Sequence, residues 1–177
     1  MCTILRATPD NAAVILAIQK RAFEEEARLC GNQEIPPLTE SIEAVVGHIE
    51  TATVLVARNG TRIVGSVRGL VADGVCTIRG LGIEPEFQGQ GIGSALLCAL
   101  ERALPHVAHF ELLTNNAMES NVRFYQRHGY RTTDLRQFSD RITLAHMSKA
   151  VSAGDAQPGG QPDPPICGSP RPVRGDP

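Results

Sequence analysis

The feature that most constrains this chain is the stretch from Gly80 to Ser94, GLGIEPEFQGQGIGS. A strand-like apolar pattern ends at Pro85, which has no N–H to donate to a neighbouring strand. A glycine-rich turn follows, and apolar residues then recur at helical spacing from Leu96 to Leu104, before Pro105. Glycines at a helix start leave main-chain N–H groups uncovered, and the positive end of the helix dipole adds to their attraction for anions. The stretch therefore predicts a strand, a phosphate-binding loop and a helix, in that order.

Two patterns in the chain resemble those of a known family. Gln88, Gly91 and Gly93 are spaced as in the acyl-CoA loop of the GNAT N-acetyltransferases, commonly written Gln/Arg-x-x-Gly-x-Gly/Ala. Downstream, Asn121 to Tyr130 reads Asn-x-x-x-Tyr-x-x-x-Gly-Tyr, which is similar to a helix and the following strand of that family. Two patterns in this order are far more specific than either alone. The resemblance covers about residues 3–149.

The resemblance implies an α/β (α+β) fold with a mixed, mostly antiparallel central sheet flanked by helices. Periodicity and turn signals place strands at residues 4–8, 53–57, 62–71, 75–84, 107–114, 130–135 and 141–147, and helices at 10–28, 40–50, 94–104 and 120–129. Residues 31–39 include Pro36-Pro37 and are predicted to be a loop without helix. Gly80, in a strand interior, predicts a bulge or a close approach of another group.

The domain organisation predicted from composition is one domain, residues 1–149, and a tail, residues 150–177. From Val151 onward, 12 of 27 residues are Pro or Gly and almost none is apolar enough to pack, so the tail is expected to be disordered. Lys and Arg number 17 against 19 Asp and Glu, a net charge of −2, and this balance offers no basic surface for nucleic acid.

The cysteines and the hydropathy of the chain indicate whether disulfides, a metal site, a signal peptide or a membrane span should be expected. Five cysteines are scattered without Cys-x-x-Cys or Cys/His ligand spacing, which predicts reduced thiols and no metal site. The N-terminus lacks the pattern of a signal peptide, and no apolar stretch reaches membrane-spanning length. A cytoplasmic protein without a membrane partner is therefore expected.

The resemblance implies an acyl-CoA-dependent enzyme that moves acetyl from acetyl-CoA to a primary amine of a small molecule or of a peptide or protein. By position, the pyrophosphate is expected at Gln88, Gly89, Gln90, Gly91, Ile92, Gly93 and Ser94, and the pantetheine at the strand edge formed by Leu81, Gly82 and Ile83. The family's central strand separates from its neighbour near this edge. Asn121 is expected either to contact the coenzyme or to cap its helix. Gln90 stands where the family commonly has Arg or Lys.

The catalytic expectations centre on Tyr125, which matches the family's general acid. A phenol, with a reference pKa of about 10, is protonated at neutral pH and can donate to the leaving thiolate. The base is less defined: Glu111 is the first candidate, with Glu84, Glu34 or a chain of waters as alternatives. The acidic run from Glu24 to Glu26 predicts either a solvated helix face or an acidic lip for a cationic substrate.

Two other functions compete with the enzyme. A non-catalytic acyl-CoA-binding regulatory domain of the same fold is favoured by the absence of an obvious base. A dinucleotide oxidoreductase is disfavoured, because its glycine fingerprint follows the first strand of a βαβ unit, whereas an antiparallel meander comes first here. Members of the family often form homodimers, and the resemblance leaves that assembly open.

Overall fold

The computed structural model describes residues 2–31, 35–140 and 142–151 of the 177-residue chain. Most of the predicted tail, from residue 152, lies outside them, as does Glu34. The strands are β1 (Cys2–Arg6), β2 (Thr53–Asn59), β3 (Arg62–Ala72), β4 (Val75–Ile83), β5 (His109–Asn115), β6 (Arg131–Ser139) and β7 (Ile142–Ala150). The helices are α1 (Ala12–Cys30), α2 (Pro36–Thr39), α3 (Ile42–Thr51), α4 (Ile92–Ala103) and α5 (Glu119–Arg127), with 3-10 turns at Pro9–Asn11 and Pro85–Phe87.

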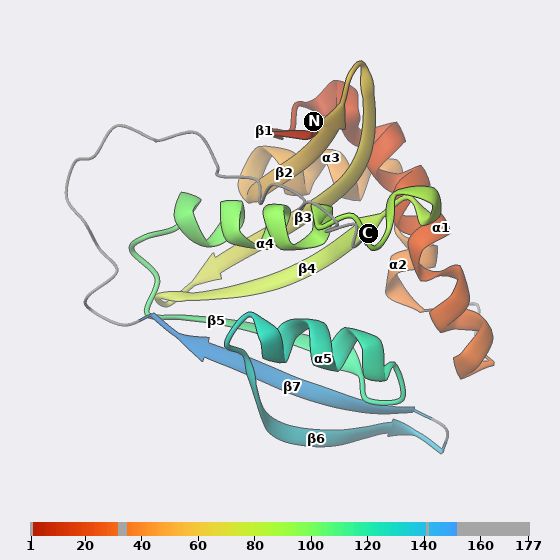
Figure 1. Cartoon of the computed structure of the whole chain (residues 1–177), viewed down its shortest axis with the longest axis vertical. Helices are drawn as coiled ribbons and strands as arrows, with labels where there is room; N and C mark the ends of the chain where they lie inside the picture. Colours follow the sequence, from red (N-terminus) through yellow and green to blue (C-terminus); the bar gives the residue numbers. More distant parts are fainter. Residues whose placement is uncertain (1, 32–34, 141, 152–177) are drawn as a thin grey trace, which may run out of the picture.

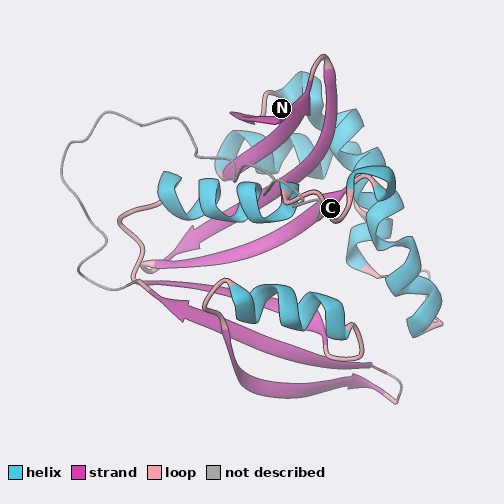
Figure 2. Ribbon diagram, in the orientation of Figure 1, coloured by secondary structure: helices cyan, strands magenta, loops and turns pink. Residues whose placement is uncertain are grey.

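The strands form one sheet in the order β1-β2-β3-β4-β5-β7-β6, which Figures 1 and 2 show from the same side. Neighbouring strands are antiparallel except β4 and β5, which are parallel and are connected through α4. A parallel pair needs such a crossover, because the chain must return to the end of the sheet where it began. The predicted mixed, mostly antiparallel sheet flanked by helices is therefore confirmed.

Helices cover both faces of the sheet, and each face has its own apolar core. In Figure 1, α4 and α5 lie in front of the sheet and α3 lies behind it. The front core includes Leu96, Leu97, Leu100, Phe110, Leu112 and Met147. The core behind the sheet includes Ala12, Ile15, Val45, Ile49, Val54 and Val56, from α1, α3 and β2. Because burying a large apolar side chain contributes about 1.5–3 kcal/mol, these two cores supply the main stabilisation of the three layers.

The segment after α1 differs from the prediction. A single helical turn, α2, starts at Pro36, where a loop without helix was predicted. That prediction was wrong because proline disrupts a helix interior but fits the first turn, where an N–H has no partner in any case. The next helix, α3, begins after Ser41, whose hydroxyl accepts a hydrogen bond from the Ala44 N–H at 3.2 Å.

The predicted irregularity at Gly80 is a β-bulge in β4. The pairing between β3 and β4 shifts by one residue between Ser66 and Arg68. Gly80 has a φ of +59°, which residues with a Cβ seldom adopt, and a Cβ there would lie 3.1 Å from Gln19 Oε1. The bulge therefore requires glycine, and Gly80 lies just before the last three residues of β4.

Candidate active site

The sheet opens between β4 and β5. The two strands pair at three positions, and the last of these joins Thr77 to Glu111. Beyond this pair the described residues form no ladder between β4 and β5, so one edge of β4 is unpaired from Ile78 to Ile83. Main-chain N–H and C=O groups on such an edge need another partner. The three residues predicted to meet the pantetheine, 81–83, lie on this edge.

The glycine loop follows directly. Gly89 and Gly91 have φ values of +73° and +79°, and apart from its chain neighbours no described residue comes within 4 Å of the position that a Cβ would take on either glycine. Gly91 is the N-cap of α4 and offers no side chain to the helix. Within the described part of the chain, no acceptor is found for the main-chain N–H groups of residues 89–94. Uncovered donors at a helix start are the arrangement that binds phosphate groups.

Two glutamines hold the loop in this shape. Gln88 Nε2 donates to the Ile83 carbonyl at 3.2 Å, and Gln90 Nε2 donates to the Glu86 carbonyl at 3.1 Å. Both side chains are therefore engaged within the loop itself, and the anion-binding capacity lies in the main chain. Ile92 is buried and fixes the first turn of α4 in the core.

Helix α5 packs against the start of α4. The ring of Phe124 lies 3.5 Å from the position that a Cβ would take on Gly93. Tyr125 is partly buried, and its ring makes edge contacts with Phe124 and Tyr130 at centroid distances of 5.1 and 5.8 Å. Asn121 is partly buried one turn before Tyr125. The structure thus brings both sequence patterns together at one junction of α4 and α5.

The environment of Tyr125 favours its protonated form. Burial raises the pKa of the phenol above its ordinary value, and the Glu26 carboxylate on α1 raises this pKa further. No hydrogen-bond partner of the Tyr125 hydroxyl is found among the described residues. A protonated phenol without a partner is available to donate to a substrate atom.

Glu111, the first candidate base, lies at the point where β4 and β5 separate. Its Oε1 accepts a hydrogen bond from Thr77 Oγ1 at 3.1 Å, and its Oε2 lies 3.1 Å from His146 Nε2. His146 Nδ1 in turn lies 2.7 Å from Thr133 Oγ1. A polar chain thus runs across four strands, and Glu111 is anchored within it.

The contacts of Glu84 indicate a structural role. Its carboxylate is 3% exposed and accepts hydrogen bonds from Arg21 Nε and Nη2 at 2.8 and 2.6 Å. The Arg21 hydrogen bonds lower the pKa of Glu84, and the charge of Arg62, 3.5 Å away, lowers it further. A carboxylate held ionised by two guanidinium groups is poorly suited to accept a proton at neutral pH.

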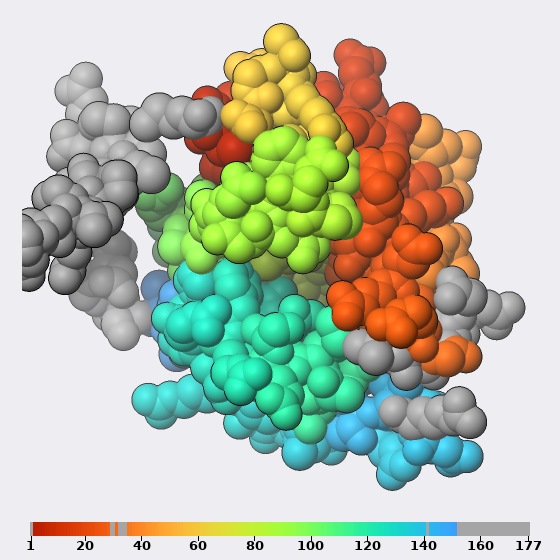
Figure 3. Space-filling model, turned by 45° about the vertical axis from the view of Figure 1, so that its right-hand side comes forward, coloured from red at the N-terminus to blue at the C-terminus, as the bar shows by residue number. Residues whose placement is uncertain are grey.

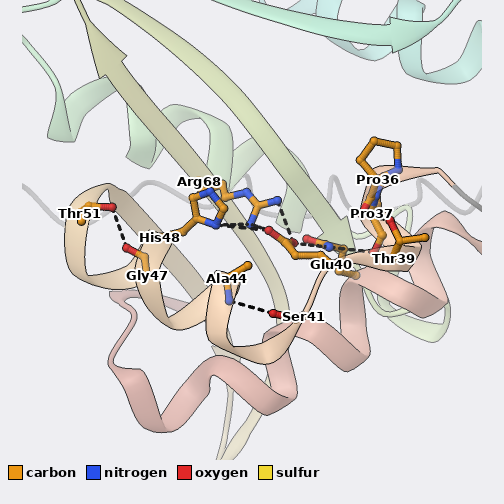
Figure 4. Close-up of polar contacts among 11 residues, drawn as sticks. Pro36, Pro37, Thr39, Glu40, Ser41, Ala44, Gly47, His48, Thr51 and Arg68 are labelled. Atoms are coloured by element: carbon orange, nitrogen blue, oxygen red, sulfur yellow. Dashed lines mark hydrogen bonds and ion pairs between the residues drawn. The ribbon is translucent and has the colours of Figure 1, made fainter.

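A second buried polar cluster lies behind the bulge, and Figure 4 shows most of its members. Arg68 on β3 donates to both oxygens of Glu40, and Gln19 Nε2 donates to Glu40 Oε2 at 2.7 Å and to the Pro37 carbonyl at 2.9 Å. His48 Nδ1 lies 3.3 Å from Glu40 Oε1. The cluster fixes the segment after α2 against the sheet. Sequence reasoning missed it, and the only available signal was a charged residue inside an apolar strand.

The surface of this region has a furrow between α4 and α5. Figure 3 shows it between the green and teal atoms, with the orange C-terminal half of α1 on one side.

Within the described ranges, no group of three or more His, Cys, Asp or Glu side chains is placed to hold a metal ion. Among the helices that the structure describes, none has the length and hydrophobicity needed to span a bilayer.

Relatives by sequence are named as acetyltransferases. YjcF of Bacillus subtilis (strain 168), an uncharacterized N-acetyltransferase, is 24% identical over 123 residues, which cover 70% of this chain and 80% of that protein. MJ1530 of Methanocaldococcus jannaschii, also an uncharacterized N-acetyltransferase, is 37% identical over 83 residues, which cover 45% of this chain and 53% of that protein.

Solved structures share the fold. An N-acetyltransferase from Thermoplasma acidophilum in complex with coenzyme A has a TM-score of 0.71, with 14% identity over 85% of this chain and 99% of that one. A putative acetyltransferase from Salmonella typhimurium, YncA, solved with acetyl-CoA, has a TM-score of 0.69, with 17% identity over 94% and 99%. A ribosomal-protein-alanine N-acetyltransferase from Brucella melitensis has a TM-score of 0.70, with 18% identity over 84% and 99%.

The family assignment rests on the sequence itself. A model of the acetyltransferase (GNAT) domain matches residues 21–151, which include the glycine loop, the opening of the sheet and α5. The protein therefore belongs to the GNAT family of acyl-CoA-dependent N-acetyltransferases.

Proposed function

We propose that this protein transfers acetyl from acetyl-CoA to a primary amine on a small molecule or on a peptide or protein. One observation supports it above others: the uncovered N–H groups of residues 89–94 adjoin the unpaired edge of β4, and the Tyr125 phenol lies on the helix that packs against them. In this proposal the loop binds the pyrophosphate, residues 81–83 pair with the pantetheine amides, and Asn121 contacts the same arm.

The chemistry follows from these positions. A main-chain N–H on the free edge of β4 polarises the thioester carbonyl, as an oxyanion site does. The neutral amine attacks this carbon, and the departing sulfur takes the proton of Tyr125. An alkyl amine, with a pKa of about 10, arrives as ammonium and must first lose a proton, for which the sequence predicts Glu111.

The names of the relatives guide the choice of acceptors. One fold relative is named for acting on a ribosomal protein's alanine, so a peptide that begins with alanine belongs in a test panel beside small amines. The decisive experiment incubates the purified protein with acetyl-CoA and propylamine, methoxyamine, spermidine, lysine or such a peptide, and follows free thiol. Amine-dependent release is expected. Coenzyme affinity without release from any amine would instead favour a non-catalytic acyl-CoA-binding domain.

The proposal also includes the cellular location of the protein and its oligomeric state. Cys2, Cys76 and Cys98 are free thiols, which supports a cytoplasmic, reducing location. A homodimer is proposed from the family resemblance alone. Sedimentation of the purified protein tests the dimer, and fractionation of the source cells tests the location.

A further inference from the structure

Helix α1 carries one carboxylate that differs from its neighbours. A Cβ on Gly82 would lie 3.2 Å from Ala22 Cβ, so α1 packs closely on one face of β4, within the segment of β4 that does not pair with β5. Glu26 is one turn beyond Ala22 and projects from the same face of the helix. It is partly buried, whereas Glu24 and Glu25 are exposed. The acidic run therefore divides into two solvated residues and one partly buried residue.

Glu26 and the Tyr125 phenol lie within electrostatic range of each other. The carboxylate is close enough to the phenol to raise its pKa, and burial raises the pKa of Glu26 itself. Figure 3 shows the C-terminal half of α1 beside α5, where the furrow ends. No hydrogen bond or ion pair of Glu26 is found among the described residues, although a partly buried carboxylate usually has a partner. An unpaired anion at this place is suited to a cationic ligand.

The two candidate bases that the structure describes near the opening are already engaged. Glu84 is held by two arginines, and both oxygens of Glu111 have partners. Glu111 also lies where β4 and β5 are still paired, at the closed end of the opening. Of the three carboxylates Glu26, Glu84 and Glu111, Glu26 alone has no partner among the described residues and acts electrostatically on Tyr125.

We propose that Glu26 binds the protonated amine of the acceptor and takes its proton, a role that rests on the proposed acetyl transfer. The first proton passes from the ammonium to the Glu26 carboxylate and then to water. The amine nitrogen bonds to the thioester carbon, the C–S bond breaks with its electron pair on sulfur, and sulfur takes the Tyr125 proton. The second proton, which the nitrogen loses as the amide forms, restores the phenol.

The test compares two nucleophiles of similar size at neutral pH. Propylamine is protonated and needs a base, whereas methoxyamine is already unprotonated and does not. Glu26→Gln is expected to lower kcat/KM for propylamine about 100-fold, the scale of general-base catalysis, and for methoxyamine less than about 3-fold. Glu25→Gln removes the same charge one residue away, from a side chain that is 70% exposed, and is expected to leave both rates unchanged. Glu26→Asp, which keeps a carboxylate, is expected to retain most of the propylamine activity.

The possible results distinguish a failure of the proposed acetyl transfer from a failure of the role proposed for Glu26. Wild-type protein that releases no thiol with any amine of the panel overturns acetyl transfer itself. Wild-type activity that Glu26→Gln leaves unchanged, or lowers equally for both nucleophiles, overturns only the role of Glu26. A selective loss of propylamine activity in Glu111→Gln instead assigns the base to Glu111. Thermal melting and coenzyme affinity of each variant, both expected to match wild type, exclude a folding defect as the cause.

Discussion

Arg68 of β3 donates two hydrogen bonds to the carboxylate of Glu40, at Nη1–Oε1 and Nη2–Oε2 distances of 2.7 and 3.0 Å. The two side chains are only 12% and 10% exposed, so both charges are largely removed from water. Burial by itself raises the pKa of Glu40, but hydrogen bonds from Arg68 and Gln19 together lower it below the ordinary value. The pair joins the middle of the sheet to the segment between α2 and α3.

Breaking this buried pair on one side should be costly. Glu40→Gln leaves the Arg68 charge buried without its partner, and we expect a loss of about 3 kcal/mol in the free energy of unfolding. The double variant with Arg68→Met is expected to lose less than the sum of the single variants. Urea unfolding measures these values. Glu119→Gln, which removes an ion pair with side chains 64% and 75% exposed, is the control and should cost less than about 1 kcal/mol.

The stability of the protein should fall in acid through Glu84. Its folded-state pKa lies below the ordinary value of 4.5, so protonation favours the unfolded chain. The stabilisation is therefore present above the unfolded-state pKa and is lost as the pH falls through the folded-state value. Glu84→Gln, which cannot ionise, should be less stable than wild type at neutral pH, and the difference should shrink below pH 4.5. Urea unfolding midpoints of wild type and Glu84→Gln across this pH range test the prediction. A difference in stability between the two proteins that does not change with pH would contradict it.

The glycine loop can be tested with a matched pair of substitutions. Gly91 and Gly60 have φ values of +79° and +60°, and both have open space where a Cβ would lie. Each change to alanine should cost about 1–2 kcal/mol of stability, because both strain the backbone alike. Only Gly91→Ala places a methyl group beside the uncovered N–H groups, so it alone should weaken coenzyme A binding, by about tenfold or more. Calorimetric titration with coenzyme A measures this, and equal affinities would contradict the loop assignment.

Tyr125→Phe tests the proposed acid. The variant keeps the ring and its contacts with Phe124 and Tyr130 but loses the proton that sulfur would take. We expect kcat to fall about 100-fold while coenzyme A affinity stays within twofold. Tyr130→Phe is the control: its hydroxyl donates to Glu101 at 2.7 Å in the core, so it should change stability rather than turnover. Unchanged turnover in Tyr125→Phe would remove the acid role.

Most of the fold could be predicted from the sequence, because each element carries a local signal. The alternation of apolar residues in the strands and the glycine loop before an apolar helix are set by short-range sterics and periodicity. The prediction failed at Pro36, where the allowed first turn of a helix overrode the general rule against proline. The presence of both family patterns could likewise be predicted from the sequence, since each pattern depends on a fixed spacing of residues.

The sequence by itself determined which groups the chain possesses: main-chain donors at residues 89–94, a phenol at Tyr125 and a run of acidic residues on α1. Tertiary structure decided what each carboxylate does. Glu84 and Glu111 meet partners brought from elsewhere in the chain, whereas Glu26 has no partner among the described residues and acts electrostatically on Tyr125. The physical reason is that a carboxylate acts according to its desolvation and its neighbours, and both depend on contacts between residues that are distant in the sequence.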